Sequence, residues 1–246
     1  MDQSVTPILG IPFFNGNVSD VYNALSTHGG LLTVPAAPAL VTIGDDSNYY
    51  HALLKSDIII PDSGYMVLIW NFISTQRIRK ISGLEFINFF LESFTFADKS
   101  RLMLVNPSDY DGEINLRYLN HRGFKIDSND LYTAPYYNET VKDEHLLKKV
   151  EMRKPQWILI NIGGGTQEKL GYYLKESLSY RPAIVCTGAA LAFKTGRQVS
   201  IPPWADYIYL GWLFRCMTQP KLYIPRYLKA FKLIYLILKY KSNKVA

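Results

Sequence analysis

The chain reads WILINIGGGTQE from Trp157 to Glu168, and this stretch decides the fold. The unbroken apolar run predicts a strand that is buried on both faces, as strands of parallel sheets are. The three glycines predict a tight turn, and a helix is expected to begin near Gln167. Backbone amides at such a turn and at a helix N-terminus favour a bound anion, for example a nucleotide diphosphate.

This turn matches neither of the two common glycine-rich nucleotide motifs. Glu168 stands where the dinucleotide-binding fingerprint has its third glycine, and no acidic residue ends the next strand. No Gly-Lys-Ser/Thr follows, so the turn is not a P-loop. A dehydrogenase of the Rossmann type is therefore a disfavoured alternative.

Further apolar runs alternate with helix-like windows along the chain. We predict strands at Leu31–Val34, Asp57–Ile60, Arg101–Val105, Gln156–Ile162 and Ala183–Thr187. We predict helices at Asp20–Ser26, Asp46–Lys55, Tyr65–Phe72, Gly83–Ala97, Asp111–Arg122, Asp143–Met152 and Gln167–Leu178. This alternation is typical of an α/β fold in which helices cover both faces of a mostly parallel sheet.

Composition and length fit one globular domain with an appendage. The chain has 246 residues, of which 48% are hydrophobic and 20% charged, so it is neither disordered nor collagen-like. The pair Pro202–Pro203 predicts a boundary between a domain at 1–199 and an appendage at 200–246. Two cysteines cannot build a disulfide framework.

Positive charge is concentrated at the end of the chain. The formal charge is +6, yet eight Lys and Arg residues lie from Arg215 onward and no acid follows Asp206. The end of the chain is therefore +8 and the remainder is −2. This distribution argues against a domain-wide nucleic-acid surface and indicates that the tail meets something anionic.

The basic tail forms an amphipathic pattern after Pro225. One half of the predicted helix carries the basic residues, and the other half carries Tyr227, Phe231, Ile234, Tyr235 and Leu238, although Leu233 and Leu236 fall on the basic side. A basic helix with aromatic residues suits an anionic membrane surface. A terminal helix docked on the body, with solvated lysines, is the alternative, and both can hold. The run from Leu233 to Leu238 is far shorter than the roughly 20 apolar residues of a spanning helix, and we expect a cytoplasmic location.

Ligands of open parallel sheets lie beyond the carboxyl ends of the strands. Asp62 follows a predicted strand in the turn Pro61-Asp-Ser-Gly64. There its carboxylate could take a proton from a hydroxyl, or it could cap the next helix. Thr187 and Gly188 follow another strand and leave room for a ligand or for close packing, and Thr33 lies at an equivalent level.

Two other patterns are discounted. Asp109-Tyr-Asp111 matches a metal-binding Asp-x-Asp, but the surrounding Asn-Pro-Ser and Gly favour a turn and an N-cap. The four histidines lack the spacing of a zinc site.

These motifs together resemble the WecG/TagA/CpsF family of bacterial glycosyltransferases, glycosyltransferase family 26. The resemblance is colinear from about Leu31 to Leu228. Its elements are Thr33, Pro61-Asp-Ser-Gly64, Lys80-Ile-Ser-Gly83, the glycine-rich strand end with Gln167-Glu168, Thr187-Gly-Ala-Ala190, Phe193-x-x-Gly196, Pro202-x-Trp204, Gly211-Trp-Leu-Phe-Arg215 and Pro220-Lys-Leu-x-x-x-Arg226-Tyr227.

The resemblance implies a Rossmann-like fold of the type termed GT-E with a helical C-terminal appendage. It implies inverting transfer of a hexose or N-acetylhexosamine from a UDP-sugar to a polyprenyl-diphosphate-linked saccharide, in exopolysaccharide, capsule or cell-wall glycan synthesis. Asp62 corresponds to the proposed base, Gln167 to a contact of the donor sugar or pyrophosphate, and Arg215 and Arg226 to appendage residues that contact the diphosphates. No cofactor or metal is implied.

The expected catalytic residue is therefore Asp62, and the expected substrate-binding residues are Thr33, Gly163, Gly164, Gly165, Gln167, Thr187, Gly188, Arg215 and Arg226. The expected partners are the nucleotide-sugar donor, the lipid-linked acceptor and the anionic inner face of the plasma membrane, without nucleic acid and with a homo-oligomer left open. A catalytically silent nucleotide-sugar binder or membrane scaffold of the same machinery is the alternative function.

Overall fold

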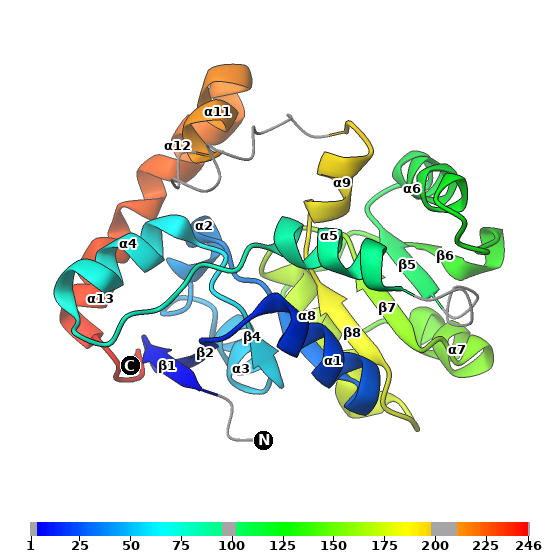
Figure 1. Cartoon of the computed structure of the whole chain (residues 1–246), viewed down its shortest axis with the longest axis horizontal. Coiled ribbons are helices and arrows are strands. Elements are labelled where there is room, and N and C mark those ends of the chain that lie inside the picture. Colours follow the sequence, from blue (N-terminus) through cyan, green and yellow to red (C-terminus); the bar gives the residue numbers. More distant parts are fainter. Residues whose placement is uncertain (1–3, 95–101, 198–210, 246) are drawn as a thin grey trace.

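The computed structural model describes residues 4–94, 102–197 and 211–245. Its centre is a six-stranded sheet in the order β4-β3-β8-β7-β5-β6, with every neighbouring pair parallel (Figure 1). The strands are β3 (Gly30–Thr33), β4 (Ile58–Ile59), β5 (Leu102–Asn106), β6 (Leu131–Thr133), β7 (Trp157–Ile160) and β8 (Ala183–Cys186). The predicted α/β class and parallel sheet are confirmed.

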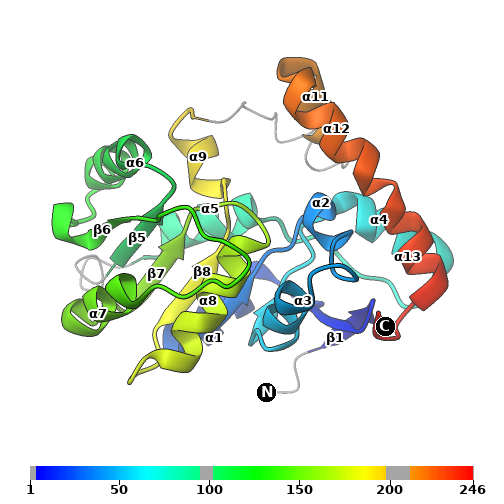
Figure 2. The same cartoon turned by 180° about the vertical axis from the view of Figure 1, so that it is seen from behind.

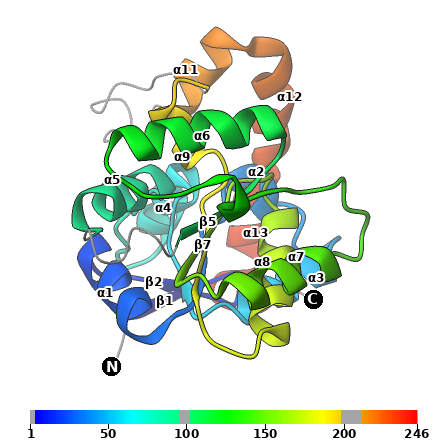
Figure 3. The ribbon, with the colours of Figure 1, turned by 90° about the vertical axis from the view of Figure 1, so that its right-hand side faces the viewer.

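Helices cover both faces of this sheet, as Figure 3 shows end-on. The helices α1 (Val18–His28), α5 (Gly83–Ser93) and α6 (Asp109–His121) contribute to the core on one face. On the other face lie α7 (Glu144–Arg153) and α8 (Thr166–Ser177), with α3 (Ser47–Leu54) beside α8. Because both faces are covered, every residue of β7 is buried, which explains its unbroken apolar sequence.

The helices begin within two residues of their predicted starts because polar side chains cap them. In five helices a side-chain oxygen just before the helix accepts a hydrogen bond from an amide of the first turn. These caps are Asp46 for α3, Ser63 for α4 (Gly64–Ile73), Ser82 for α5, Ser108 for α6 and Asp143 for α7. Such caps each contribute about 1 kcal/mol. The helix α5 ends at Ser93, before the predicted end at Ala97. Residues 95–101 lie outside the described part of the chain.

Several short elements were not predicted. They are an antiparallel hairpin of β1 (Val5–Ile8) and β2 (Ile11–Phe14), the helices α2 (Ala37–Leu40) and α9 (Ala190–Lys194), the 3-10 helix η2 (Ser128–Asp130) and the strand β6. The hairpin turn is Leu9–Gly10, with φ of 55° and 72°. Two positive φ values are typical of the hairpin turn type that twists with its strands.

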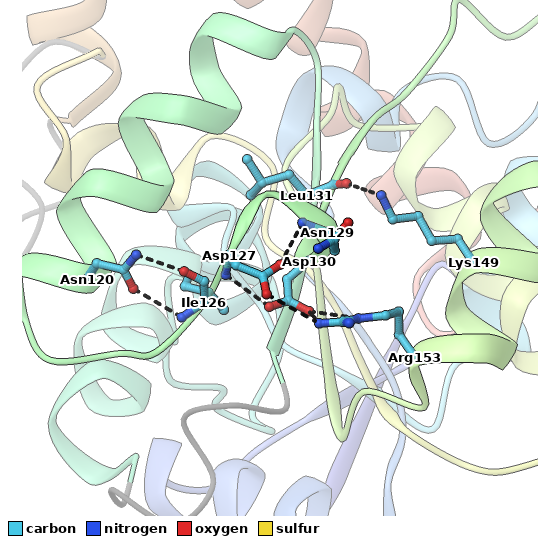
Figure 4. Close-up of polar contacts among 8 residues, drawn as sticks. All are labelled: Asn120, Ile126, Asp127, Asn129, Asp130, Leu131, Lys149 and Arg153. Atoms are coloured by element: carbon cyan, nitrogen blue, oxygen red, sulfur yellow. Dashed lines mark hydrogen bonds and ion pairs between the residues drawn. The ribbon is translucent and has the colours of Figure 1, made fainter.

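The edge strand β6 is fixed by polar contacts rather than by burial (Figure 4). The buried carboxylate of Asp130 accepts hydrogen bonds from the Arg153 guanidinium on α7, at 2.7 and 3.2 Å. Lys149, also on α7, donates to the Leu131 carbonyl at 2.6 Å. These contacts tie η2 and β6 to α7.

Three helices follow residue 210, namely α11 (Gly211–Thr218), α12 (Pro220–Ala230) and α13 (Lys232–Tyr240). In Figures 1 and 2, α11 and α12 extend away from the sheet, while α13 lies near the hairpin. Leu233, Leu236 and Ile237 of α13 are buried in a second core that includes the hairpin, α3 and α4. The expected domain boundary near residue 200 lies outside the described residues, and α13 shares a core with the N-terminal hairpin.

The docked face of α13 is the one that sequence analysis placed on the basic side. Phe231, Tyr235 and Leu238 instead remain 59%, 58% and 52% exposed. The terminal helix therefore docks on the body and still presents an apolar face outward. None of the helices that the structure describes is both long and apolar enough to cross a bilayer.

Candidate active site

The loops that follow β4, β8 and β7 meet at one rim of the sheet. All three strands are parallel, so Asp62, Thr187 and the Gly163–Gly165 turn follow carboxyl ends at the same edge. Since β3 and β8 lie between β4 and β7, the strands β4 and β7 are about 14 Å apart. That spacing is wider than a single hexose ring, so one sugar can be held only where the segments beyond the strands approach each other.

Asp62 does not cap the helix that follows it. Ser63 caps α4, because its hydroxyl accepts the Met66 amide at 3.1 Å. The Asp62 carboxylate is half-buried and accepts the backbone amide of Gly83, the first residue of α5, at 3.0 Å. The N-terminus of α5 thus stabilises negative charge on Asp62 and fixes the position of the carboxylate at the rim.

A continuous line of contacts joins Asp62 to Gln167. A Cβ atom placed on Gly83 would lie 3.6 Å from the Thr187 carbonyl oxygen, and one on Gly188 would lie 3.5 Å from Oε1 of Gln167. Gly188 also has a φ of 57°, which favours glycine. Small residues at these positions therefore let the N-terminus of α5 approach the loop after β8, and let that loop approach Gln167 at the start of α8.

Glu168 fixes the orientation of the neighbouring Gln167 amide. Both side chains are buried, and Nε2 of Gln167 donates to Oε1 of Glu168 at 3.0 Å. The other Glu168 oxygen accepts the Gly165 amide at 2.6 Å. Nε2 of Gln167 is thereby held by the carboxylate, and both ends of the Gln167 amide lie close to Gly188.

Burial dominates the electrostatics of Glu168. Desolvation raises the pKa of this carboxyl from 4.5 to about 7, even though the hydrogen bonds from Gln167 and Gly165 favour the ionised form. The Gly165 amide is also engaged by this carboxyl, and the Gln167 amide donates to the Gly163 carbonyl at 3.1 Å. Two amides of the turn that were expected to face an anion therefore have partners inside the protein.

Three buried polar atoms of this rim have no hydrogen-bond partner in the described structure. They are Oε1 of Gln167, Oγ1 of Thr187 and Oδ1 of Asn161. Asn161 follows β7, and its Nδ2 donates to Asn106 at the end of β5, at 3.2 Å. Buried polar groups are nearly always paired in proteins, so these atoms mark a place where a ligand would supply the missing partners.

The remaining predicted residues lie at different distances from this cluster. The Thr33 hydroxyl is fully buried and donates to Ser56 at 3.1 Å, so it contacts the loop before β4 rather than the rim. Arg215 and Arg226 lie on α11 and α12. The helix α12 packs against α2, which follows β3 at the rim, and Gly164 approaches Ala39 of α2. The backbone therefore brings the helix of Arg226 next to the loops of the rim.

Asp109 and Asp111 lie within the first turn of α6, and the predicted N-cap role falls to Ser108 instead of an aspartate. Ser108 caps the helix, Asp111 pairs with Arg197 at 3.0 Å, and Asp109 accepts a hydrogen bond from Thr133. Within the described ranges, no group of three or more His, Cys, Asp or Glu side chains is placed to hold a metal ion.

The fold and the rim together define a class of α/β protein that binds its ligand beyond the carboxyl ends of a parallel sheet, with a carboxylate at one side of the site. A sequence model of the Glycosyl transferase WecG/TagA/CpsF family matches residues 6–246. The chain therefore belongs to this family, and it is a glycosyltransferase of glycan synthesis. A search of curated proteins finds no significant match to an individual sequence.

Proposed function

We propose that the protein is an inverting glycosyltransferase that needs no metal ion. It transfers a hexose or N-acetylhexosamine from a UDP-sugar to a polyprenyl-diphosphate-linked saccharide, in the synthesis of exopolysaccharide, capsule or cell-wall glycan. The observation that carries this proposal is the rim itself, where a positioned carboxylate and a set of unpaired buried polar atoms are linked by close contacts.

Asp62 acts as the general base in this mechanism. Its carboxylate takes the proton of the acceptor hydroxyl while that oxygen attacks the anomeric carbon of the donor. The bond from the anomeric carbon to the diphosphate oxygen breaks on the opposite face, and its electron pair leaves with UDP. The configuration at the anomeric carbon is therefore inverted.

Gln167 contacts the sugar rather than the diphosphate. Its unpaired group is a carbonyl oxygen, which accepts hydrogen bonds, and the Asn161 oxygen is of the same kind. Sugar hydroxyls can donate to such atoms, whereas ionised phosphate oxygens only accept. The neighbouring Thr187 hydroxyl and the backbone of Gly188, which packs against Gln167, complete this wall of the pocket.

The diphosphate lies at the exposed glycines Gly163 and Gly164, near the N-terminus of α8. The helix dipole there stabilises the charge that develops on the leaving UDP. Arg226, on α12 beside α2, and Arg215, on the preceding helix α11, supply cationic groups to the two diphosphates. Because the chain carries eight basic residues and no acid from Arg215 onward, the same segment suits an anionic membrane that holds the lipid acceptor.

The replacement Asp62→Asn tests this assignment. It keeps the shape of the side chain and removes the base, so we expect transfer to fall by about 10²- to 10⁴-fold. Binding of UDP, measured as a rise in the unfolding temperature, should persist. An undiminished rate would end the role of Asp62. If the unaltered protein binds UDP but neither hydrolyses any UDP-sugar in a panel nor transfers its sugar, the alternative of a catalytically silent nucleotide-sugar binder is favoured instead.

A further inference from the structure

One helix of the sheet domain leaves an apolar face in solvent. The helix α4 has the sequence GYMVLIWNFI and contains no charged residue. Met66, Val67 and Trp70 are buried on its inner side. On the outer side Leu68 is 49% exposed and Phe72 is 91% exposed, which is unusual for an isolated phenylalanine of a soluble surface.

This face of α4 continues onto α13. The two helices are in contact, and the rings of Tyr65 on α4 and Phe231 meet edge to face at 5.9 Å. Figures 1 and 2 show both helices at the end of the molecule opposite α6 and α7. We call the exposed apolar residues of these two contacting segments, Leu68, Phe72, Phe231, Tyr235 and Leu238, the α4–α13 face.

Lysines border the α4–α13 face along α12 and α13, and one of them, Lys232, pairs with Asp45 at 3.3 Å. Lys229, Lys232 and Lys239 are exposed on α12 and α13, and α4, α12 and α13 contain no Asp or Glu. Lys239 lies over the rings of Tyr235 and Tyr240, at 5.7 and 4.8 Å from their centroids. An apolar surface bordered by lysines is complementary to a bilayer with anionic headgroups, whereas a second copy would bring like charges together.

We propose that the α4–α13 face inserts into an anionic membrane, so that a helix of the catalytic body binds lipid together with the tail. The inference deepens the proposed function and rests on it. It also orients the active site, because α4 begins two residues after Asp62 and its ten residues span about 15 Å. Asp62 therefore lies within about one helix length of the inserted residues, on the side of the protein that faces the lipid-linked diphosphate.

The replacement Phe72→Ser tests the proposal in the full-length protein. The assay is co-sedimentation with vesicles of phosphatidylcholine containing about one quarter phosphatidylglycerol. If about half of the Phe72 side chain inserts into the bilayer, its loss should weaken vesicle binding about tenfold. The matched control is Tyr136→Ser, because Tyr136 is 97% exposed in the loop between β6 and α7 and lies outside the α4–α13 face. This control should bind vesicles as the unaltered protein does.

Activity separates this proposal from the proposed function. Transfer to a short-chain, water-soluble lipid diphosphate should be unchanged in Phe72→Ser, since that acceptor needs no membrane. The unaltered protein could transfer no sugar while the Phe72→Ser variant still binds vesicles more weakly than it does. In that case the proposed function fails and the assignment of the α4–α13 face to the membrane stands.

Three results would overturn the proposal. One is equal vesicle binding by Phe72→Ser and the unaltered protein, and another is an equal loss of binding in Tyr136→Ser. The third is a dimer in sedimentation velocity that Phe72→Ser dissociates without any change in vesicle binding, because the face would then belong to a second copy.

Discussion

Polar side chains close the end of the molecule formed by α6, β6 and α7, whereas apolar side chains close the end formed by the hairpin, α4 and α13. At the first end, Asp143 caps α7 and accepts hydrogen bonds from Tyr132 and Tyr137, at 2.8 and 2.6 Å. Burial and this carboxylate raise the pKa of both phenols. At the polar end the side chains form hydrogen bonds with one another. At the apolar end each of the helices α4 and α13 buries one side in the core and leaves the other side exposed to a partner.

The largest expected effect is at the apolar end. Leu233 is fully buried between α13 and the hairpin core, so Leu233→Ala should lower the free energy of unfolding by about 2–5 kcal/mol. Urea denaturation measures the change. The matched control is Leu238→Ala on the same helix, where the side chain is 52% exposed and we expect a change below about 1 kcal/mol. Equal losses would show that α13 does not dock through the face described.

The second largest effect is expected at Glu168 on α8, in its influence on how the free energy of unfolding depends on pH. The helix α8 contacts α3 of the hairpin side, and Lys169 pairs with Asp46 at 2.9 Å. Because burial raises the pKa of Glu168 from 4.5 to about 7, the folded protein keeps a proton that the unfolded chain releases. The contribution of this proton to the free energy of unfolding is complete below about pH 4.5, falls as pH rises and is lost above about pH 7.

Replacing Glu168 by Gln should remove this part of the pH dependence, which amounts to about 3 kcal/mol between the two pH limits. Urea titrations at several pH values measure it. The same replacement places an amide where the carboxylate held Nε2 of Gln167, so we also expect a higher KM for the donor sugar. An unchanged pH profile would show that Glu168 is ionised in the folded protein throughout this range.

The smallest effect is expected at the polar end. Asp130 is 8% exposed and pairs with Arg153, which is 40% exposed. Asp130→Asn should therefore lower the free energy of unfolding by about 1–2 kcal/mol, less at high salt. The control is Asp45→Asn, whose exposed partner Lys232 lies 3.3 Å away and which should cost below about 1 kcal/mol. A loss at Asp130 as large as that of Leu233→Ala would contradict the contrast between the two ends.

Local patterns were enough to predict five of the six strands of the sheet and the longer helices that cover it. Runs such as Trp157–Ile160 are apolar throughout because helices cover both faces, and capping residues such as Ser82 and Asp143 mark where helices begin. The hairpin was missed because Pro7 and Pro12 disfavour strands and its turn lacks the usual Asn-Gly. Which face of α13 docks could not be predicted, since Leu233 and Phe231 lie on two apolar stripes of one short helix and only the hairpin decides between them.

The candidate site was predicted in position but only partly in detail. The rule that ligands lie at carboxyl ends of parallel strands placed Asp62 and the glycine turn at one rim. The hydroxyl of Thr33 contacts Ser56 instead, because side chains of a strand alternate between faces. Asn161 and Glu168 were overlooked, although both lie in the stretch that decides the fold. Only the folded structure shows why they matter, because the Asn161 side-chain oxygen is buried without a hydrogen-bond partner and the Glu168 carboxyl is buried with a raised pKa.

The shared core of the hairpin and α13 has a consequence for synthesis of the protein. The Leu9 amide donates to the Lys241 carbonyl at 2.7 Å, and Ile8 and Phe13 pack in the same core as Ile237. Ribosomes add about 5–20 residues per second, so the first strands wait on the order of ten seconds or more for the helix that covers them. During that interval their apolar side chains are accessible to chaperones, because α13 follows the hairpin by more than 200 residues.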